Sequence, residues 1–383
     1  QMENRIVLAR FKDGYGPVGA YFLHLKTYTQ NGLGEEYESN WFPALEEMVG
    51  KRYLDVEASH RTHRPIPTCL RNHALLNEVN AGRGPIHMVT MEAFQDPHLE
   101  EIGWHNFLGM TVGQAVLWAA TDVNPKYENP ELTLSEPYVM GSHATGCGAW
   151  CSGPEDISPD EYFWGYNRMT TVEGLFGAGD AVGGTPHAFS SGSFTEGRLA
   201  AKAACQYIDD GKAEGIRVSQ EQIDRRKAEI YKPMEHYKIY RNEIVAGTVN
   251  PNYINPRQGL DRLQKLMDEY CGGVTVNYMT NEKLLQIGLK KMKTLEEDLE
   301  KVAAENVHEL LRAWELKHRT LASEAVFHHT LFRKETRWPG YYYRGDVMKV
   351  DDDNWHVLTV SRRDPETGEY TMEKAPCYHL VED

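Results

Sequence analysis

The sequence has few of the residues that would assign it to a class at once. Only six of its 383 residues are cysteines, and only Cys147 and Cys151 lie near each other. So few thiols give no disulfide framework, and their spacing is too wide for an iron–sulfur cluster. The cysteine usage therefore predicts a chain that resides in a reducing compartment, the cytoplasm.

Long apolar runs and positive charge are also lacking. No apolar stretch approaches the roughly 20 residues that cross a bilayer, which predicts no membrane insertion. The net charge of −15 argues against nucleic acid or an anionic membrane as a partner. An anionic substrate would therefore need a locally basic pocket. The length is sufficient for two or three domains with cores of their own.

A dinucleotide-binding fingerprint is absent as well. Flavin and nicotinamide folds normally open with a strand, a G-x-G-x-x-G turn and a helix. Nothing here fits that pattern, and the opening residues Gln1 to Asn4 are not typical of a natural start. We therefore expect the C-terminal part of a longer subunit, without its first dinucleotide-binding segment.

The richest stretch runs from Gly174 to Ala204. Leu175, Phe176 and Ala178 predict a short buried strand, followed by a glycine-rich loop. After Ser193 the apolar residues recur with the period of an amphipathic helix, at Ala200, Ala203, Ala204 and Tyr207. Serines at the N-terminus of that helix would favour an anionic ligand. An ordinary strand–loop–helix connection with a serine cap is the alternative.

The last third of the chain reads as helical. Apolar residues recur every three or four positions at Leu285, Leu289, Met292, Leu295, Leu299 and Val302. Packing of this stripe within the chain is favoured over a coiled-coil dimer, because the run covers under three heptads. Asn306 and Glu309 form a capping-box pattern that predicts the start of another helix. A small hairpin is expected near the end, after a solvated acidic run at Asp351–Asp353.

These stretches carry a resemblance to a known family. GLFGAGD followed by SSGSFTEGRLAAKAA resembles the second flavin-contacting segment of the fumarate reductase and succinate dehydrogenase flavoprotein superfamily. Three stretches are most similar to adenylylsulfate reductase alpha subunits: GTPHAFSSGSFTEGR, ARFKDGYGPVGA and LFRKETRWPGYYYR. The resemblance implies an α+β multidomain fold. Its parts are a capping domain (1–135), the second segment of a Rossmann-like FAD-binding domain (136–210), a helical domain (211–335) and a C-terminal tail (336–383).

The resemblance also implies a chemistry. The expected cofactor is FAD, and the expected reaction interconverts adenylyl sulfate and sulfite plus AMP through a flavin–sulfite adduct, in dissimilatory sulfur metabolism. The direction of the reaction stays open, because the same site serves sulfate reduction and sulfite oxidation. An iron–sulfur beta subunit is implied as the electron-transfer partner.

Roles for individual residues follow from the same resemblance. Arg10 and His187 are expected to be catalytic and to stabilise oxyanion charge, although a solvated arginine and a loop-capping histidine are the plainer interpretations. Phe22, Leu23 and Arg71 are expected to bind substrate, and no metal ligand is expected. The flavin-binding positions are Gly179, Asp180, Ser190, Ser191, Gly192, Ser193 and Phe194.

One run departs from the wider superfamily. Its succinate and fumarate enzymes carry Glu-Ser-Arg-Gly-His where this chain has residues 335–341, ETRWPGY, without the histidine. That difference argues against a dicarboxylate substrate. The tyrosines Tyr341, Tyr342 and Tyr343, with Trp338, could be core or part of a partner surface. A fumarate reductase-like or aspartate oxidase-like flavoprotein, and a non-catalytic fragment that serves subunit docking, remain as alternatives.

Overall fold

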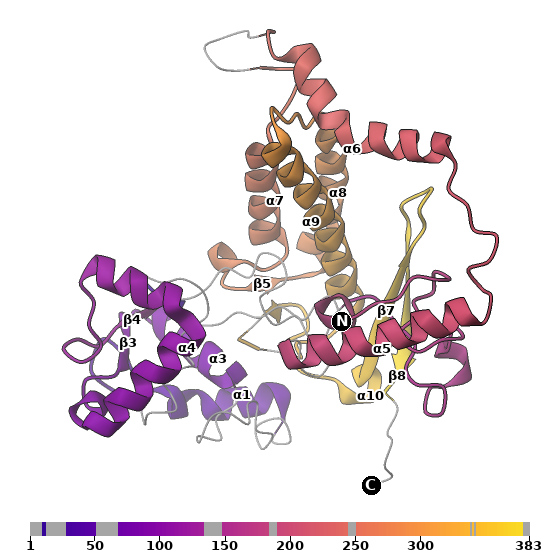
Figure 1. The fold of residues 1–383 in the computed structure, drawn as a ribbon. Helices are drawn as coiled ribbons and strands as arrows, with labels where there is room; N and C mark the ends of the chain where they lie inside the picture. The colour runs from indigo at the N-terminus through magenta and orange to yellow at the C-terminus, as the bar shows by residue number, and fades with distance from the viewer. Residues whose placement is uncertain are drawn as a thin grey trace.

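The computed structural model describes residues 10–12, 28–50, 68–133, 148–183, 190–243, 250–337, 339–340 and 342–377. Figure 1 shows an N-terminal α+β part in purple, an upright group of helices in orange and a C-terminal hairpin in yellow. In this view the red helix α5 (Ser190–Asp209) crosses the hairpin, and α6 (Gln220–Tyr240) is drawn above the hairpin. The proposed domain boundaries stay predictions.

A small antiparallel sheet organises the N-terminal part. Its strand order is β1-β4-β3-β2, and Ile86 lies opposite Leu132. The strands are β1 (Arg10–Phe11), β2 (Tyr28–Gln30), β3 (Ile86–Val89) and β4 (Glu131–Thr133).

Helices cover this sheet. They are η2 (Glu38–Trp41), α1 (Phe42–Val49), α3 (Thr68–Asn80), η3 (Ala93–Gln95) and α4 (Pro97–Thr121). α4 begins where the Asp96 side chain accepts a hydrogen bond from the His98 N–H, with Pro97 in the first turn. It ends at Asp122, whose left-handed backbone stops the helix. The apolar core between sheet and helices includes Leu75, Ile86, Met88, Phe94 and Trp118.

The middle part is built from short bridges rather than a sheet. Ala149 pairs with Val182, Cys151 with Thr170, and Met169 with Phe176. The elements are η4 (Asp160–Tyr162), η5 (Gly179–Ala181) and α5 (Ser190–Asp209). The buried strand expected at residues 175–178 is wrong: only an isolated bridge forms there, and Leu175 is 54% exposed.

The turn before that bridge explains the error. Leu175 N–H donates to the carbonyl of Val172, and Gly174 takes a positive φ of 76°, so the chain reverses direction where a strand would have to begin. The helix that follows is confirmed, because Ala200, Ala203 and Tyr207 are buried along one face of α5.

The helical part has four long helices in the described ranges: α6 (Gln220–Tyr240), α7 (Pro256–Tyr270), α8 (Glu282–Leu299) and α9 (Val307–Phe332). Between them lie η6 (Val274–Val276) and β5 (Met279–Thr280), which pairs in parallel with β6 (Tyr343–Arg344). Ser219 and Asn255 cap α6 and α7 with complete capping boxes.

The apolar stripe of α8 packs within the chain, as favoured from the sequence. Leu285, Met292 and Leu295 are buried with residues of α7 and α9 in one core. The predicted cap of α9 is confirmed at Asn306, which accepts from the Glu309 N–H. The Glu309 carboxylate returns to the N–H of Glu305 rather than to that of Asn306.

The chain ends in α10 (Asp352–Trp355) and a hairpin of β7 (Val357–Arg363) and β8 (Tyr370–Pro376). The expected hairpin is thus confirmed. The acidic run is more than a solvated face: Asp351 caps α10, and Asp352 forms an ion pair with Arg337. A small cluster of Leu76, Tyr278 and Tyr343 joins the N-terminal part to the helical part.

Candidate functional site

The N-terminus of α5 meets the loop that carries Gly179. Gly179 has a φ of +66°, and a Cβ atom there would lie 3.1 Å from the Ser193 hydroxyl oxygen. The backbone of the loop therefore approaches the first turn of α5 closely. The first turn of a helix presents N–H groups that lack acceptors within their own helix, and it carries a partial positive charge. The two elements together form a place suited to an anionic or electron-rich group.

Two further glycines let the framework behind this loop close. A Cβ atom at Gly148, whose φ is +151°, would lie 2.7 Å from three backbone atoms of residues 181–183. A Cβ atom at Gly177 would lie 2.7 Å from the Cys151 sulfur. Ala149 N–H donates to the Ala181 carbonyl at 2.7 Å. The position of η5 therefore depends on a close approach of two backbone segments.

An ion pair that the sequence analysis missed fixes α5 against this framework. Arg168 contacts Glu196 through both ends of its guanidinium, with Nε–Oε2 at 2.7 Å and Nη2–Oε1 at 2.9 Å. The Glu196 side chain is only 9% exposed, and that of Arg168 is 20% exposed. Their separation of 28 residues leaves no periodic signal in the sequence. Glu196 lies in SFTEGR, and its carboxylate faces the framework rather than a ligand.

The cofactor positions fall partly within the described residues. Gly179 is buried. Gly192 and Ser193 are half-buried in the first turn of α5, and Phe194 is 80% exposed. Asp180 lies in η5, and Ser190 and Ser191 open α5, but the side chains of these three residues lie outside the description. The structure thus brings Gly179 and the start of α5 together, as expected.

The catalytic and substrate positions fall mostly outside the described residues. The structure does not describe Phe22, Leu23 or His187. Arg10 is placed in β1 and Arg71 in α3, without a description of their side chains. Their roles stay predictions.

Cys151 is half-buried and free. Burial raises the pKa of its thiol, and a backbone hydrogen bond from Gly177 and the charge of Arg168 only partly oppose this effect. A thiol with a raised pKa is a poor nucleophile at neutral pH. The raised pKa therefore fits a structural role for Cys151; Cys147 lies outside the described residues.

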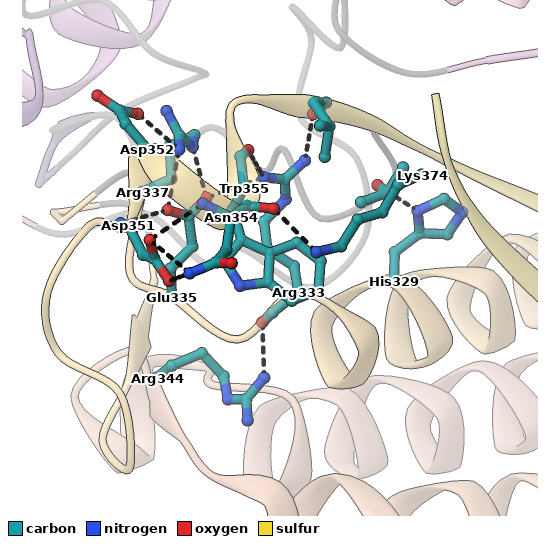
Figure 2. Close-up of polar contacts among 12 residues, drawn as sticks. His329, Arg333, Glu335, Arg337, Arg344, Asp351, Asp352, Asn354, Trp355 and Lys374 are labelled. Carbon is teal, nitrogen blue, oxygen red and sulfur yellow. Dashed lines mark hydrogen bonds and ion pairs between the residues drawn. The ribbon is translucent and has the colours of Figure 1, made fainter. Parts of the chain in front are cut away.

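The run that departs from the superfamily forms a buried ionic network (Figure 2). Glu335, which is fully buried, accepts hydrogen bonds from Arg333 and Arg337 and from the backbone N–H of Asp351. Arg333 also donates to the carbonyl of Trp355 at 2.8 Å. These contacts tie the end of α9 to α10, so this run is a structural clip.

A second buried arginine joins two helix ends. Arg344 donates to the carbonyls of Thr330 and Arg333 at the C-terminus of α9, and Figure 2 shows it reaching the latter. It also pairs bidentately with Asp346, at 3.0 and 2.9 Å. Burial works to raise the pKa of Asp346, but the hydrogen bond and the charge of Arg344, together with backbone hydrogen bonds, outweigh burial and lower that pKa. Asp346 in turn accepts from the Glu282 N–H at the start of α8. Tyr342 and Tyr343 are buried beside this clip.

The described part of the chain has neither a membrane-spanning helix nor a cluster of metal-binding side chains. No helix within the described ranges combines the length and the apolar character that a membrane crossing requires. In the same parts of the chain, no three His, Cys, Asp or Glu side chains gather in a way that would hold a metal ion.

Comparison with known proteins gives a consistent set of relatives. Residues 260–380 match the family described as fumarate reductase flavoprotein C-term. The chain is 43% identical to the adenylylsulfate reductase alpha subunit of Megalodesulfovibrio gigas over 400 residues, which cover 99% of this chain and 58% of that subunit.

Solved structures agree. Adenylylsulfate reductase from the hyperthermophilic Archaeoglobus fulgidus is 47% identical, with a TM-score of 0.89 over 100% of this chain and 60% of that chain. A structure of adenosine-5-phosphosulfate reductase in complex with sulfite, described as a covalent adduct, gives the same identity, TM-score and coverage. The chain therefore spans about 60% of the length of these relatives, and over that span it is similar to adenylylsulfate reductases.

Proposed function

We propose that this chain is part of a flavoprotein that interconverts adenylyl sulfate and sulfite plus AMP. The observation that carries the proposal is the 47% identity to adenylylsulfate reductase over the full length of this chain, with a TM-score of 0.89. The absence of the superfamily histidine from residues 335–341 supports this activity over turnover of a dicarboxylate. The buried network around Glu335 gives that run a structural task instead.

The described residues fit an FAD cofactor. Gly179 lets its loop approach the first turn of α5 closely, and that turn offers N–H groups and a partial positive charge. Gly179, Asp180 and residues 190–194 would hold the flavin. When bound, reduced FAD would supply the two electrons that the sulfur of adenylyl sulfate gains on becoming sulfite, and oxidised FAD would accept them from sulfite in the reverse direction. The first turn of α5 would favour negative charge on the reduced ring.

The chain's own residues would bind and neutralise the substrate. Arg10 is proposed to neutralise the oxyanion charge that develops as the sulfur–oxygen bond to AMP breaks, because a guanidinium stays charged and offers paired donors. His187 is proposed to donate to the same charge or to give a proton to it. Arg71 is proposed to bind the ground-state substrate, with Phe22 and Leu23 against the adenine.

The proposal includes a partner and a setting. A subunit with iron–sulfur clusters would exchange electrons with the flavin, because no cluster-binding cysteine run occurs in this sequence. The expected setting is dissimilatory sulfur metabolism in the cytoplasm.

The test is an assay of ferricyanide reduction by the full-length subunit with its partner. We expect activity that requires both AMP and sulfite. Activity without AMP would contradict the proposal, and turnover of fumarate, succinate or aspartate would favour the dicarboxylate or aspartate oxidase alternatives.

Substitutions test the residue roles in the same complex. We expect His187→Ala and Arg10→Ala each to lower turnover at least roughly a hundredfold, because one oxyanion donor is worth about 3 kcal/mol. Arg71→Ala should raise the Michaelis constant first. His308→Ala, an exposed histidine in the first turn of α9, is the control. If His187→Ala stays within about twofold of wild type, the loop histidine is structural.

A further inference from the structure

A cavity lies in the helical part, away from the α5 loop. Its volume is about 560 Å³, within the range of small-molecule sites. Side chains of α6, α8, α9 and β7 line it. The apolar wall consists of Pro233, Leu299, Val302, Ala313 and Leu321, with the indole of Trp314 beside it.

Each cation of the lining already faces a carboxylate. The three pairs are Lys232 with Glu300, Lys317 with Glu229 at 4.0 Å, and Arg363 with Glu324 at 3.2 Å. These pairs leave little positive charge unmatched. An anionic ligand would therefore gain little here, because every cation is already neutralised.

One carboxylate of the lining remains unmatched. Glu296 lines the cavity from α8, and its Oε1 is buried without a hydrogen-bond partner among the described residues. Its neighbour Glu324 is only 3% exposed and is engaged by Arg363. Burial, followed by the negative charge of Glu324, raises the pKa of Glu296. Glu296 is half-buried as a residue, and the charges of Arg363 and Lys293 only partly oppose this rise, so a proton or a further cation would stabilise its carboxyl group.

We propose that this cavity binds a small primary alkylammonium ion. Its ammonium group pairs with Glu296, and its hydrocarbon chain lies against Leu299, Val302 and Ala313. The amine takes the place of the proton that would otherwise neutralise Glu296. The site is separate from the proposed flavin and substrate residues, so it does not depend on the proposed function.

The other ionisable groups around Glu296 do not change charge in the pH range of the test, so the proton on Glu296 is what competes with the ammonium ion. Lys293 lies on the same helix, Arg363 on β7, and Lys232 and Glu229 face the cavity from α6. His328 on α9 stays neutral above pH 5, because burial lowers its pKa to about 4. Burial raises the pKa of Tyr370 on β8, so its phenol stays protonated.

The first test is calorimetric titration of the full chain with n-pentylammonium chloride. We expect saturable binding with a dissociation constant in the millimolar range, and at least about tenfold weaker binding by Glu296→Gln. Glu297→Gln changes the same charge at the exposed neighbouring position of α8 and should bind like wild type. Equal binding of n-pentanol, or unchanged binding by Glu296→Gln, would overturn the proposal.

A second measurement uses the wild-type chain and so is independent of any folding defect in the variant. Because the ammonium displaces a proton, we expect tighter binding at pH 8 than at pH 5.5, and proton release when the titration is repeated in buffers of different ionisation enthalpy. No saturable binding up to about 50 mM, or equal affinity at the two pH values, would mean that a proton alone neutralises Glu296.

Discussion

Residues 254–363 and residues 148–209 are organised in opposite ways. The first region has a continuous core of twelve buried residues drawn from α7, α8 and α9 and the loops beside them, closed by the Glu335 and Arg344 networks (Figure 2). In the second region, isolated bridges, aromatic pairs such as Trp150 with Tyr162, and the ion pair of Arg168 with Glu196 hold the described loops. Among the described residues, none of its side chains belongs to a buried apolar cluster.

The exposed apolar side chains sharpen this difference. Val172, Leu175, Phe194 and Ile208 are each more than half exposed. The comparison teaches that the region proposed to meet the flavin has its shape fixed by glycines and backbone contacts, whereas the helical region is fixed by packing.

The largest expected effect tests the closed region. Glu335→Ala removes the carboxylate that neutralises Arg333 and Arg337, which are 1% and 11% exposed. Breaking a buried ion pair by removing one partner costs about 3–5 kcal/mol. We therefore expect the free energy of unfolding in urea to fall by about that amount. Glu366→Ala, an exposed position in the hairpin turn, should change it by less than about 0.5 kcal/mol; a similar loss in both variants would contradict the network's role.

The next effect concerns the joint between the N-terminal part and this closed region. The Tyr343 hydroxyl accepts from the Gly340 N–H at 2.9 Å, so its own proton is directed to Nδ1 of His73, 2.7 Å away. Burial lowers the pKa of His73 to about 4. Between its ordinary value of 6.5 and about 4, the unfolded chain binds a proton that the folded chain does not, so stability must fall as the pH falls through this window.

A shift of this size corresponds to at most about 3 kcal/mol. Unfolding measured at pH 7 and at pH 4.5 should therefore show a larger loss for wild type than for His73→Gln. His328 adds a loss in the same direction, because burial lowers its pKa to about 4 as well. The difference between wild type and His73→Gln isolates the contribution of His73. An identical pH dependence of the two proteins would show that the pKa of His73 is the same in the folded and the unfolded chain.

Periodicity predicted the helical region well, because the α8 stripe and the Asn306 cap are local signals. Glu335 and Arg344 were within a quoted motif, yet their partners Asp351 and Thr330 could not be predicted, because they are 16 and 14 residues away without any repeat. In the other region, the helix from Ser190 was predictable from its apolar spacing. The strand at residues 175–178 was not, because the turn at Gly174 overrides its apolar composition. The Arg168–Glu196 pair depends on tertiary contact alone.

The smallest expected effect is that of Phe194→Ala, for which Phe327→Ala serves as the reference. Phe327 is fully buried in α9, whereas Phe194 is 80% exposed in the first turn of α5. Phe327→Ala should cost about 3–5 kcal/mol of unfolding free energy, because it leaves a cavity in the core. Phe194→Ala should change that free energy by less than about 0.5 kcal/mol, because it removes little buried surface. Both values come from urea unfolding of the full chain. A cost above about 1 kcal/mol for Phe194→Ala would mean that the Phe194 ring is buried in solution. The proposed difference between the packed helical region and the open region around α5 would then be wrong.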